Sequence, residues 1–173
     1  LPGGRGMGEP LRLMIDLPND VGIVDLFIYD PKGKRLVASM AGDGFVVLEA
    51  EIVAQTRTGR QVLNVRGDVK ALLAHRVIGD HVACVGENRK VLVFALDELP
   101  EMGRGKGVRL QKYKDGGLSD ATTFAMQEGL SWKDPAERTR TVEKTELLEW
   151  VGKRASAGRM APRGFPRDNR FTK

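Results

Sequence analysis

A pattern of short apolar runs separated by glycine turns recurs along this chain at intervals of about fifty residues. The run RLVASM at residues 35–40 is followed by a Gly-Asp-Gly turn and the run FVVL. The run HVACV at residues 81–85 is followed by a Gly-Glu-Asn turn and the run KVLVF. Glycine-containing turns between apolar runs predict β-hairpins. The chain is therefore expected to build several similar hairpins in succession.

The recurrence divides the chain into units of roughly 46–50 residues. The units cover residues 24–69, 70–118 and 119–167, and residues 1–23 resemble the end of an earlier unit. A β-rich repeat of this length predicts an all-β, propeller-like fold in which neighbouring sheets bury one another's faces. We expect one domain over residues 1–173, with three to four units. A single irregular β-sandwich, with hairpins that resemble each other by chance, is the alternative.

Strands are also expected at the apolar runs outside these hairpins. These runs are Val24–Tyr29, Gln61–Val65, Lys70–Ala74, Val108–Leu110, Thr122–Phe124 and Leu130–Trp132. The third unit fits the pattern less well, because Pro135 and the charged residues around it interrupt the place where a strand is expected. Glu143–Val151 has the spacing of a short helix, although in the repeat register it matches a loop.

The composition excludes several classes of protein and site. The single cysteine, Cys84, rules out an internal disulfide framework and a cysteine-built zinc site, and two histidines, His75 and His81, leave little for a histidine-based metal site. The sequence contains no run of eighteen apolar residues, so no membrane span is predicted. The opening LPGGRGMGEP lacks the features of a signal peptide. Because the sequence also lacks an initiator Met, we expect a piece of a longer cytoplasmic protein.

Positive charge gathers at the C-terminal end of the sequence. The chain has 28 Lys and Arg against 23 Asp and Glu, a net charge of +5, and residues 151–173 alone contribute +6. Charge alone leaves two interpretations open for this tail. It is either a solvated basic segment or an electrostatic arm for a polyanion.

An arginine–glycine element accompanies the repeat. Its copies begin at Arg5, Arg57, Arg104 and Arg154, at steps of 52, 47 and 50 residues. In the third copy, GRGKG at residues 103–107, glycines let backbone N–H groups approach a phosphate, and the basic side chains add charge and donors. The spacing fails both the Walker and the dinucleotide-binding patterns. The element therefore predicts contacts with a nucleic-acid backbone and no nucleotide site.

Eleven basic residues of these loops and of the tail are candidate DNA contacts. They are Arg5, Arg57, Arg60, Arg104, Lys106, Arg109, Lys112, Lys114, Arg154, Arg159 and Arg163. The sequence contains no recognisable catalytic triad, pair of catalytic acids or metal-binding cluster, so the chain is expected to catalyse nothing by itself. Cys84 is expected to be a buried thiol, and Trp132 and Trp150 are more often packing residues than base-stacking ones.

Three stretches resemble a known family. VLVFALDELPEMGRGKGVRLQKYKDGGLSDA, RLVASMAGDGFVVLEAEIVAQTRTGRQVLNV and AGRMAPRGFPRDNRF are similar to the C-terminal domain of the A subunits of bacterial DNA topoisomerase IV and gyrase. The resemblance extends from Arg5 to Phe171 and implies an open β-pinwheel that binds and bends duplex DNA on a basic rim. The Gln-Arg-Arg-Gly-rich box of gyrase has only a shortened counterpart at residues 103–107. This departure favours topoisomerase IV over gyrase, and weak bending over full wrapping.

The resemblance also implies the setting of the domain. The parent would be an ATP-dependent type II topoisomerase that relaxes and decatenates DNA during chromosome segregation, with this domain steering DNA crossings into strand passage. The catalytic core is absent here: the family's active-site tyrosine follows an arginine, which neither Tyr29 nor Tyr113 does. The implied partners are double-stranded DNA, chromosome-segregation proteins and, within an A2B2 topoisomerase IV holoenzyme, the core of the A subunit and the B subunit.

No cofactor is expected in this chain, because the resemblance assigns ATP and magnesium to other parts of the holoenzyme. The implied location is the cytoplasm at the nucleoid, and it extends to peripheral membrane association of the holoenzyme. Two other functions stay open: a propeller-like scaffold whose rim holds a protein partner, and the equivalent domain of a gyrase A subunit. DNA binding that falls steeply with salt would favour DNA holding, whereas protein capture at high salt would favour the scaffold.

Overall fold

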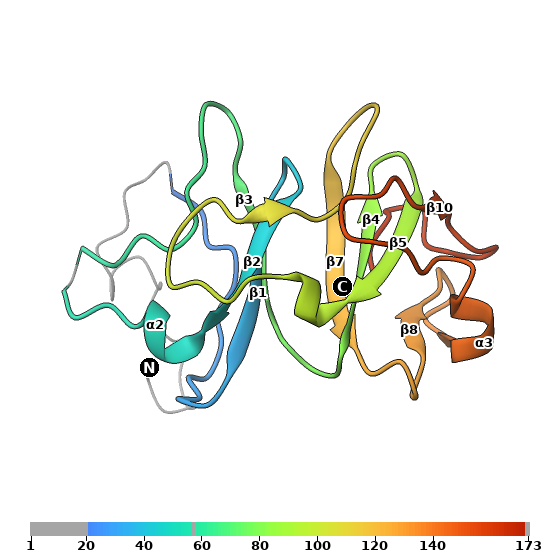
Figure 1. Cartoon of the computed structure of the whole chain (residues 1–173), viewed down its shortest axis with the longest axis horizontal. Coiled ribbons are helices and arrows are strands. Elements are labelled where there is room, and N and C mark those ends of the chain that lie inside the picture. The colour runs from blue at the N-terminus through green and yellow to red at the C-terminus, as the bar shows by residue number, and fades with distance from the viewer. Residues whose placement is uncertain (1–20, 57, 172–173) are drawn as a thin grey trace.

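The described part of the chain folds into two four-stranded sheets and a separate two-stranded hairpin (Figure 1). The computed structural model describes residues 21–56 and 58–171. Blade 1 has the strand order β3 (Ala71–Arg76), β1 (Lys34–Ser39), β2 (Asp43–Leu48) and β6 (Val108–Arg109). Blade 2 has the order β10 (Arg159–Met160), β5 (Lys90–Ala95), β4 (His81–Gly86) and β7 (Leu118–Phe124). The end hairpin consists of β8 (Leu130–Lys133) and β9 (Thr139–Val142).

Within the part of the chain that the structure describes, helical structure is limited to single turns, one after the second strand of each hairpin. These turns are α2 (Glu49–Ile52), η1 (Leu96–Glu98) and α3 (Lys144–Leu147). The prediction of an all-β chain with minor helices is therefore confirmed, and all named strand pairings are antiparallel. No helix among the described residues is long and apolar enough to cross a membrane.

The two blades repeat one pattern at a fixed interval. β4 begins at His81, 47 residues after β1 begins at Lys34, and β7 begins at Leu118, 47 residues after β3 begins at Ala71. In each blade, the first strand of a hairpin also pairs with a strand from later in the chain. The second strand of the hairpin pairs with a strand of only two residues. Within the described residues the end hairpin has neither addition. The third unit is thus a hairpin without a full sheet.

The turns explain why the apolar runs pair where they do. In blade 1 the chain turns at Gly42, which has a φ of +90° and donates its N–H to the carbonyl of Ser39 at 3.0 Å. In blade 2, Arg89 has a φ of +63° and donates its N–H to Gly86 at 3.0 Å. Positive φ at such positions lets the chain reverse with the twist that antiparallel strands require.

The turn of the end hairpin is held by one carboxylate. Asp134 accepts hydrogen bonds from the backbone N–H groups of Ala136 and Arg138, both at 2.9 Å, and from Arg140 Nε at 3.0 Å. Pro135 therefore lies in the turn, where a missing N–H costs no strand pairing. The charged run that was expected to interrupt the third unit instead closes its hairpin.

The core lies in three layers between and beside the sheets. Both faces of β1 and β4 are largely buried, as expected of strands covered on both sides. The cluster between the blades includes Leu36, Ala38, Val82, Cys84, Leu92, Phe94 and Leu118. A second cluster joins blade 2 to the end hairpin and the C-terminal tail, and a smaller one covers the outer face of blade 1.

The last strand of each blade comes from a segment that follows the next hairpin in the sequence. Residues 99–107, the first crossing loop, lead from η1 of the second hairpin back to β6 on blade 1. Residues 148–158, the second crossing loop, lead in the same way from α3 to β10 on blade 2. The blades are therefore interlocked, because neither four-stranded sheet can form from consecutive strands alone.

Backbone hydrogen bonds attach the two crossing loops at equivalent places. The N–H of Val46 donates to the carbonyl of Pro100 at 3.0 Å, and the N–H of Val93 donates to the carbonyl of Trp150 at 2.9 Å. Val46 and Val93 are each in the middle of the second hairpin strand, 47 residues apart. The loops thus make the same short parallel contact with successive blades.

Two of the predicted strands are wrong. Val24–Tyr29 has no strand structure, and Gln61–Val65 has only a single bridge, between Leu63 and Gly105. An apolar run becomes a strand only where it pairs with another strand. The places beside the β1–β2 hairpin are taken by β3 and β6, and neither run pairs with the outer edge of β3 or β6.

The C-terminal tail is folded against blade 2. Arg89 donates to the carbonyl of Phe165 at 3.1 Å, and the N–H of Phe171 donates to the buried carboxylate of Asp120 at 2.9 Å. The Phe165 ring packs edge-on between Trp132 and Phe171, each centroid 5.3 Å away. The tail backbone is therefore fixed. Beyond β10, the exposed basic side chains among its described residues are Arg163, Arg167 and Arg170.

Candidate nucleic-acid interface

A groove of about 540 Å³ at the edge of blade 1 concentrates basic side chains. It lies where the first crossing loop runs beside residues 61–69. Its four cations, all exposed, are Arg66, Arg104, Lys106 and Arg109. Among the described residues that line it, the only acid is Asp43. A concave surface of one charge sign focuses the electrostatic potential, so this basic groove is suited to a polyanion.

Asp43 lies beneath two of the cations without neutralising the groove. Its side chain is only 7% exposed, and its oxygens lie 3.6 Å from Lys106 Nζ and 4.0 Å from Arg109 Nε. These contacts are long, and the two basic side chains remain 67% and 47% exposed. Exposed ion pairs of this kind contribute little free energy. Lys106 and Arg109 can therefore exchange Asp43 for a phosphate.

The glycines of the first crossing loop allow close backbone packing. Gly107 has a φ of +84°, and a Cβ there would lie 2.3 Å from the carbonyl oxygen of Gly44. Gly105 donates its N–H to Val62 at 2.9 Å and accepts from the N–H of Asn64 at 2.8 Å. The Gly105 N–H, which the sequence suggested for a phosphate, is thus already bonded. The charge of the groove comes from side chains.

The second crossing loop uses its arginine differently. Arg154 donates from Nε to the carbonyl of Glu98 at 3.1 Å and from Nη1 to the carbonyl of Arg109 at 2.7 Å. Its backbone N–H also donates to the Glu98 carboxylate at 3.0 Å. These bonds tie the loop to blade 1 and to the turn after β5. A DNA contact by Arg154 stays a prediction, as does one by Arg159, which is exposed on β10.

The other predicted contacts lie outside the groove. Lys112 and Lys114 are exposed in the loop between β6 and β7, and Arg163 is exposed in the tail. Arg60 is 44% exposed and lies 3.6 Å from Glu51. The structure therefore brings together Arg104, Lys106 and Arg109, and spreads the remaining described candidates along the molecule.

Arg66 is the groove residue that the sequence analysis misses. It follows an apolar run in the tripeptide Arg66-Gly67-Asp68, which the sequence assigns only to a turn. Nothing in the spacing relates it to residues 103–107, because the two loops meet only through tertiary packing. Arg5 and Arg57, two of the predicted contacts, lie outside the described residues.

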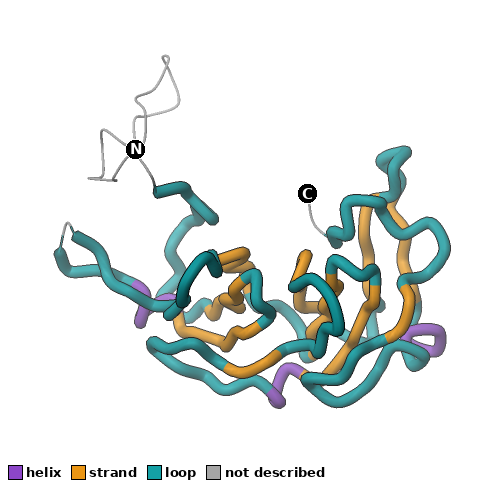
Figure 2. The backbone as a smooth tube through the Cα atoms, turned by 90° about the horizontal axis from the view of Figure 1, so that it is seen from above, coloured by secondary structure: helices purple, strands orange, loops and turns teal. Residues whose placement is uncertain are grey.

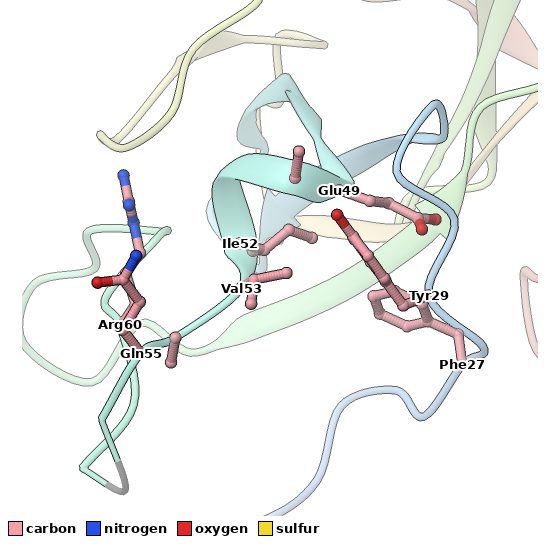
Figure 3. A pocket seen from close by; sticks show the side chains of 9 residues that line it. Phe27, Tyr29, Glu49, Ile52, Val53, Gln55 and Arg60 are labelled. Carbon is pink, nitrogen blue, oxygen red and sulfur yellow. The ribbon is translucent and has the colours of Figure 1, made fainter.

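A larger hollow, of about 810 Å³, lies on the outer face of blade 1 (Figure 3). Phe27, Tyr29, Ile52 and Arg60 contribute to its lining, together with the fully buried Glu49. Glu49 is neutralised by Arg35, whose Nε lies 2.8 Å from its carboxylate. This hollow is mixed in polarity, so the basic groove is the better candidate for an anionic ligand.

Within the described residues, the cysteine is buried and His81 is hydrogen-bonded to a neighbouring carboxylate, so both have structural surroundings. Cys84 is fully buried, and burial raises the pKa of its thiol, which leaves it protonated and unreactive. His81 Nδ1 lies 2.8 Å from Asp80, and this hydrogen bond lowers the pKa of the Asp80 carboxyl. In residues 21–56 and 58–171 no group of three His, Cys, Asp or Glu side chains is placed to hold a metal ion.

Known proteins share both the sequence and the architecture. Residues 80–118 match the family described as DNA gyrase C-terminal domain, beta-propeller. The A subunit of DNA topoisomerase 4 from Caulobacter vibrioides is 47% identical over 99% of the chain, and that from Rickettsia bellii is 43% identical over 98%. The chain belongs to the family of C-terminal domains of gyrase and topoisomerase IV A subunits. It spans 22% of the length of each of these two relatives.

Solved structures of the family share the fold of this chain. The E. coli ParC C-terminal domain aligns with a TM-score of 0.79 at 24% identity, over 94% of this chain and 69% of that one. The DNA gyrase A C-terminal domain aligns with a TM-score of 0.63 at 14% identity, over 88% and 52%. The expected β-pinwheel architecture, with open rather than closed sheets, is confirmed.

Proposed function

We propose that this domain holds duplex DNA through its phosphate backbone, without sequence preference. The observation that carries the proposal is the basic groove, which is lined by three arginines and a lysine from two loops and strand β6, with one carboxylate among them. Cations on exposed loops are suited to phosphates, which every duplex presents at the same spacing. The residues assigned to this role are Arg66, Arg104, Lys106 and Arg109, with Lys112, Lys114 and Arg159 as outer contacts.

The arrangement of the sheets favours modest bending of the bound duplex. The sheets follow one another around an open arc, as Figure 2 shows from above. A duplex that contacts basic side chains on successive blades would curve to follow this arc, at a cost set by its stiffness. The four groove cations gather on blade 1, whereas cations of the end hairpin and the tail, such as Arg138 and Arg163, lie outside the groove, which supports a short contact and weak bending.

The role proposed for the parent protein rests on its relatives. The similar proteins are named as the A subunit of DNA topoisomerase 4, so the parent is assigned to an ATP-dependent type II topoisomerase. Breakage, reunion, ATP and magnesium belong to its other parts, and this domain steers DNA crossings into relaxation and decatenation. Partners are then the core of the A subunit, the B subunit and chromosome-segregation proteins, at the nucleoid in the cytoplasm and with peripheral membrane association of the holoenzyme.

The proposal is tested by fluorescence anisotropy of two unrelated duplexes of equal length, titrated with the chain across a salt series. We expect equal affinities for both duplexes and a linear fall of log affinity with log salt, at about −0.9 per phosphate contact. Arg138→Ala is the matched control, because it removes an exposed arginine of the end hairpin, 71% exposed and far along the chain from the groove. Binding to one duplex only would refute holding without sequence preference. No binding at low salt would refute DNA holding and favour the protein scaffold.

A further inference from the structure

The side chain of Tyr113 fills the space between the turns of the two blades. It lies in the loop between β6 and β7 and packs against the core cluster between the blades. A Cβ on Gly42 would lie 2.5 Å from Tyr113 Cε2, and a Cβ on Gly86 would lie 2.8 Å from Tyr113 Cε1. Gly42 is in the turn of the blade 1 hairpin, and Gly86 is at the turn of the blade 2 hairpin. Glycine at both positions leaves the room that the ring occupies.

The backbone on either side of the ring is bonded to both hairpins. On blade 1, Leu110 donates its N–H to Gly42 at 2.8 Å, and Leu118 donates its N–H to Met40 at 3.0 Å. On blade 2, the N–H of Glu87 donates to Gly117 at 2.9 Å. The loop from β6 to β7 thus begins on blade 1 and ends on blade 2 (Figure 1). The Tyr113 ring packs near its middle.

Two exposed lysines flank the ring. Lys112 and Lys114 are the immediate neighbours of Tyr113, and within the described residues neither has an ion-pair partner. The N–H of Lys112 donates to the carbonyl of Ser156 in the second crossing loop at 2.9 Å. The backbone of the pair is therefore fixed, although the side chains reach solvent.

We propose that Tyr113 is a positioning residue that holds Lys112 and Lys114 at the junction of the blades, where they extend the phosphate contacts of the basic groove. This inference rests on the proposed function. The aromatic ring, and not the hydroxyl, positions the two lysines, because the buried Tyr113 hydroxyl has no hydrogen-bond partner within the described structure. An unpaired buried hydroxyl is a cost, so phenylalanine should serve at least as well.

The first test compares Tyr113→Ala, Tyr113→Phe and the double variant Lys112→Ala/Lys114→Ala by DNA anisotropy from 50 to 200 mM salt. Two lost phosphate contacts lower the salt slope by about 1.8, which changes the ratio of affinities across this range by about tenfold. We expect Tyr113→Ala to approach the lysine double variant in slope, and Tyr113→Phe to match the unsubstituted chain. An unchanged slope in Tyr113→Ala, or a loss in Tyr113→Phe equal to that in Tyr113→Ala, would overturn the proposal.

The second test needs no DNA and so separates this inference from the proposed function. Gly86→Ala should expel the ring and raise hydrogen exchange across residues 111–117. In a double-mutant cycle, Gly86→Ala should lower the free energy of unfolding less in the Tyr113→Ala background than in the unsubstituted chain. With the ring removed, the collision that remains is that of the new Cβ with Asn88 Oδ1. Gly22→Ala is the control, because nothing lies within 4 Å of its Cβ position. Additive effects, or exchange unchanged by Gly86→Ala, would refute the positioning role of the Tyr113 ring whatever the DNA result.

Discussion

The two crossing loops have the same course but different surfaces. The first, residues 99–107, closes blade 1, and the second, residues 148–158, closes blade 2. In each loop one glycine has nearly the same φ, +84° at Gly107 and +81° at Gly158. A Cβ would lie 2.3 Å from the carbonyl oxygen of Gly44 in the first case and 2.4 Å from that of Val91 in the second. The glycine is thus required by the architecture in both.

The arginines of the two loops are used in opposite ways. Arg104 makes one long side-chain hydrogen bond, 3.3 Å to Gln61, and otherwise faces the groove. Arg154 donates to the backbone carbonyls of Glu98 and Arg109 and so ties the second crossing loop to these two segments. The comparison shows that a repeated Arg-Gly element can preserve a backbone requirement while its arginine lines the basic groove in one copy and ties two segments of the fold together in the other.

The largest expected effect tests what the loops share. Gly107→Ala and Gly158→Ala should each destabilise the chain by about 2–4 kcal/mol, because a positive φ is combined with a collision against a carbonyl. Gly59→Ala is the control, since Gly59 has a φ of +84° but nothing within 4 Å of its Cβ position. It should cost only about 1 kcal/mol. Chemical denaturation of the three variants measures the difference, and equal losses in all three would remove close packing as the reason for the glycines.

The next effect tests where the loops differ. Arg154→Ala should lower the free energy of unfolding by about 1–2 kcal/mol, because it removes charged donors from two carbonyls near the surface. Arg104→Ala should change it by less than about 0.5 kcal/mol, as expected of an exposed side chain. Urea denaturation of the two variants side by side checks this order. If Arg104→Ala proved the more destabilising, the structural role assigned to Arg154 and the ligand-contact role assigned to Arg104 would be reversed.

The smallest effect concerns the end hairpin, which no crossing loop completes within the described residues. Hydrogen bonds, first of all from the Arg138 backbone N–H, lower the pKa of Asp134 below its usual range. A lowered folded-state pKa stabilises the chain above the unfolded pKa of about 3.9, and this stabilisation is lost as the pH falls through the folded value. The unfolding free energy of the natural chain should therefore decrease more than that of Asp134→Asn between pH 5 and pH 3. Parallel pH profiles would show that the turn does not depend on this carboxylate.

Local sequence signals account for the hairpins but not for the way they interlock. The turns at Gly42 and Gly86 and the apolar runs around them predict four strands of the two blades, because a hairpin needs only neighbouring residues. β6 and β10 are two residues long and pair with a strand of an earlier hairpin, so no local pattern marks their partner. The failure at Val24–Tyr29 has the same origin, since a free sheet edge is a tertiary property.

The same distinction applies to the candidate site. The element at residues 103–107 marks Arg104 and Lys106 by composition alone, and both line the groove. Arg66 joins them only because its loop packs beside the first crossing loop. The tail is basic by composition, yet its backbone is bound by Arg89 and Asp120, which are distant in the sequence.

The salt dependence of DNA binding, compared between the two loops, tests the central claim most directly. The triple variant Arg104→Ala/Lys106→Ala/Arg109→Ala and the single variant Arg154→Ala should be titrated with one duplex across the same salt series. If each groove cation meets one phosphate, the triple variant flattens the slope by about 2.7, whereas Arg154→Ala leaves it within about 0.5 of the unsubstituted chain. An unchanged slope in the triple variant, or an equal flattening in both, would contradict the account that one loop holds DNA and the other holds the fold.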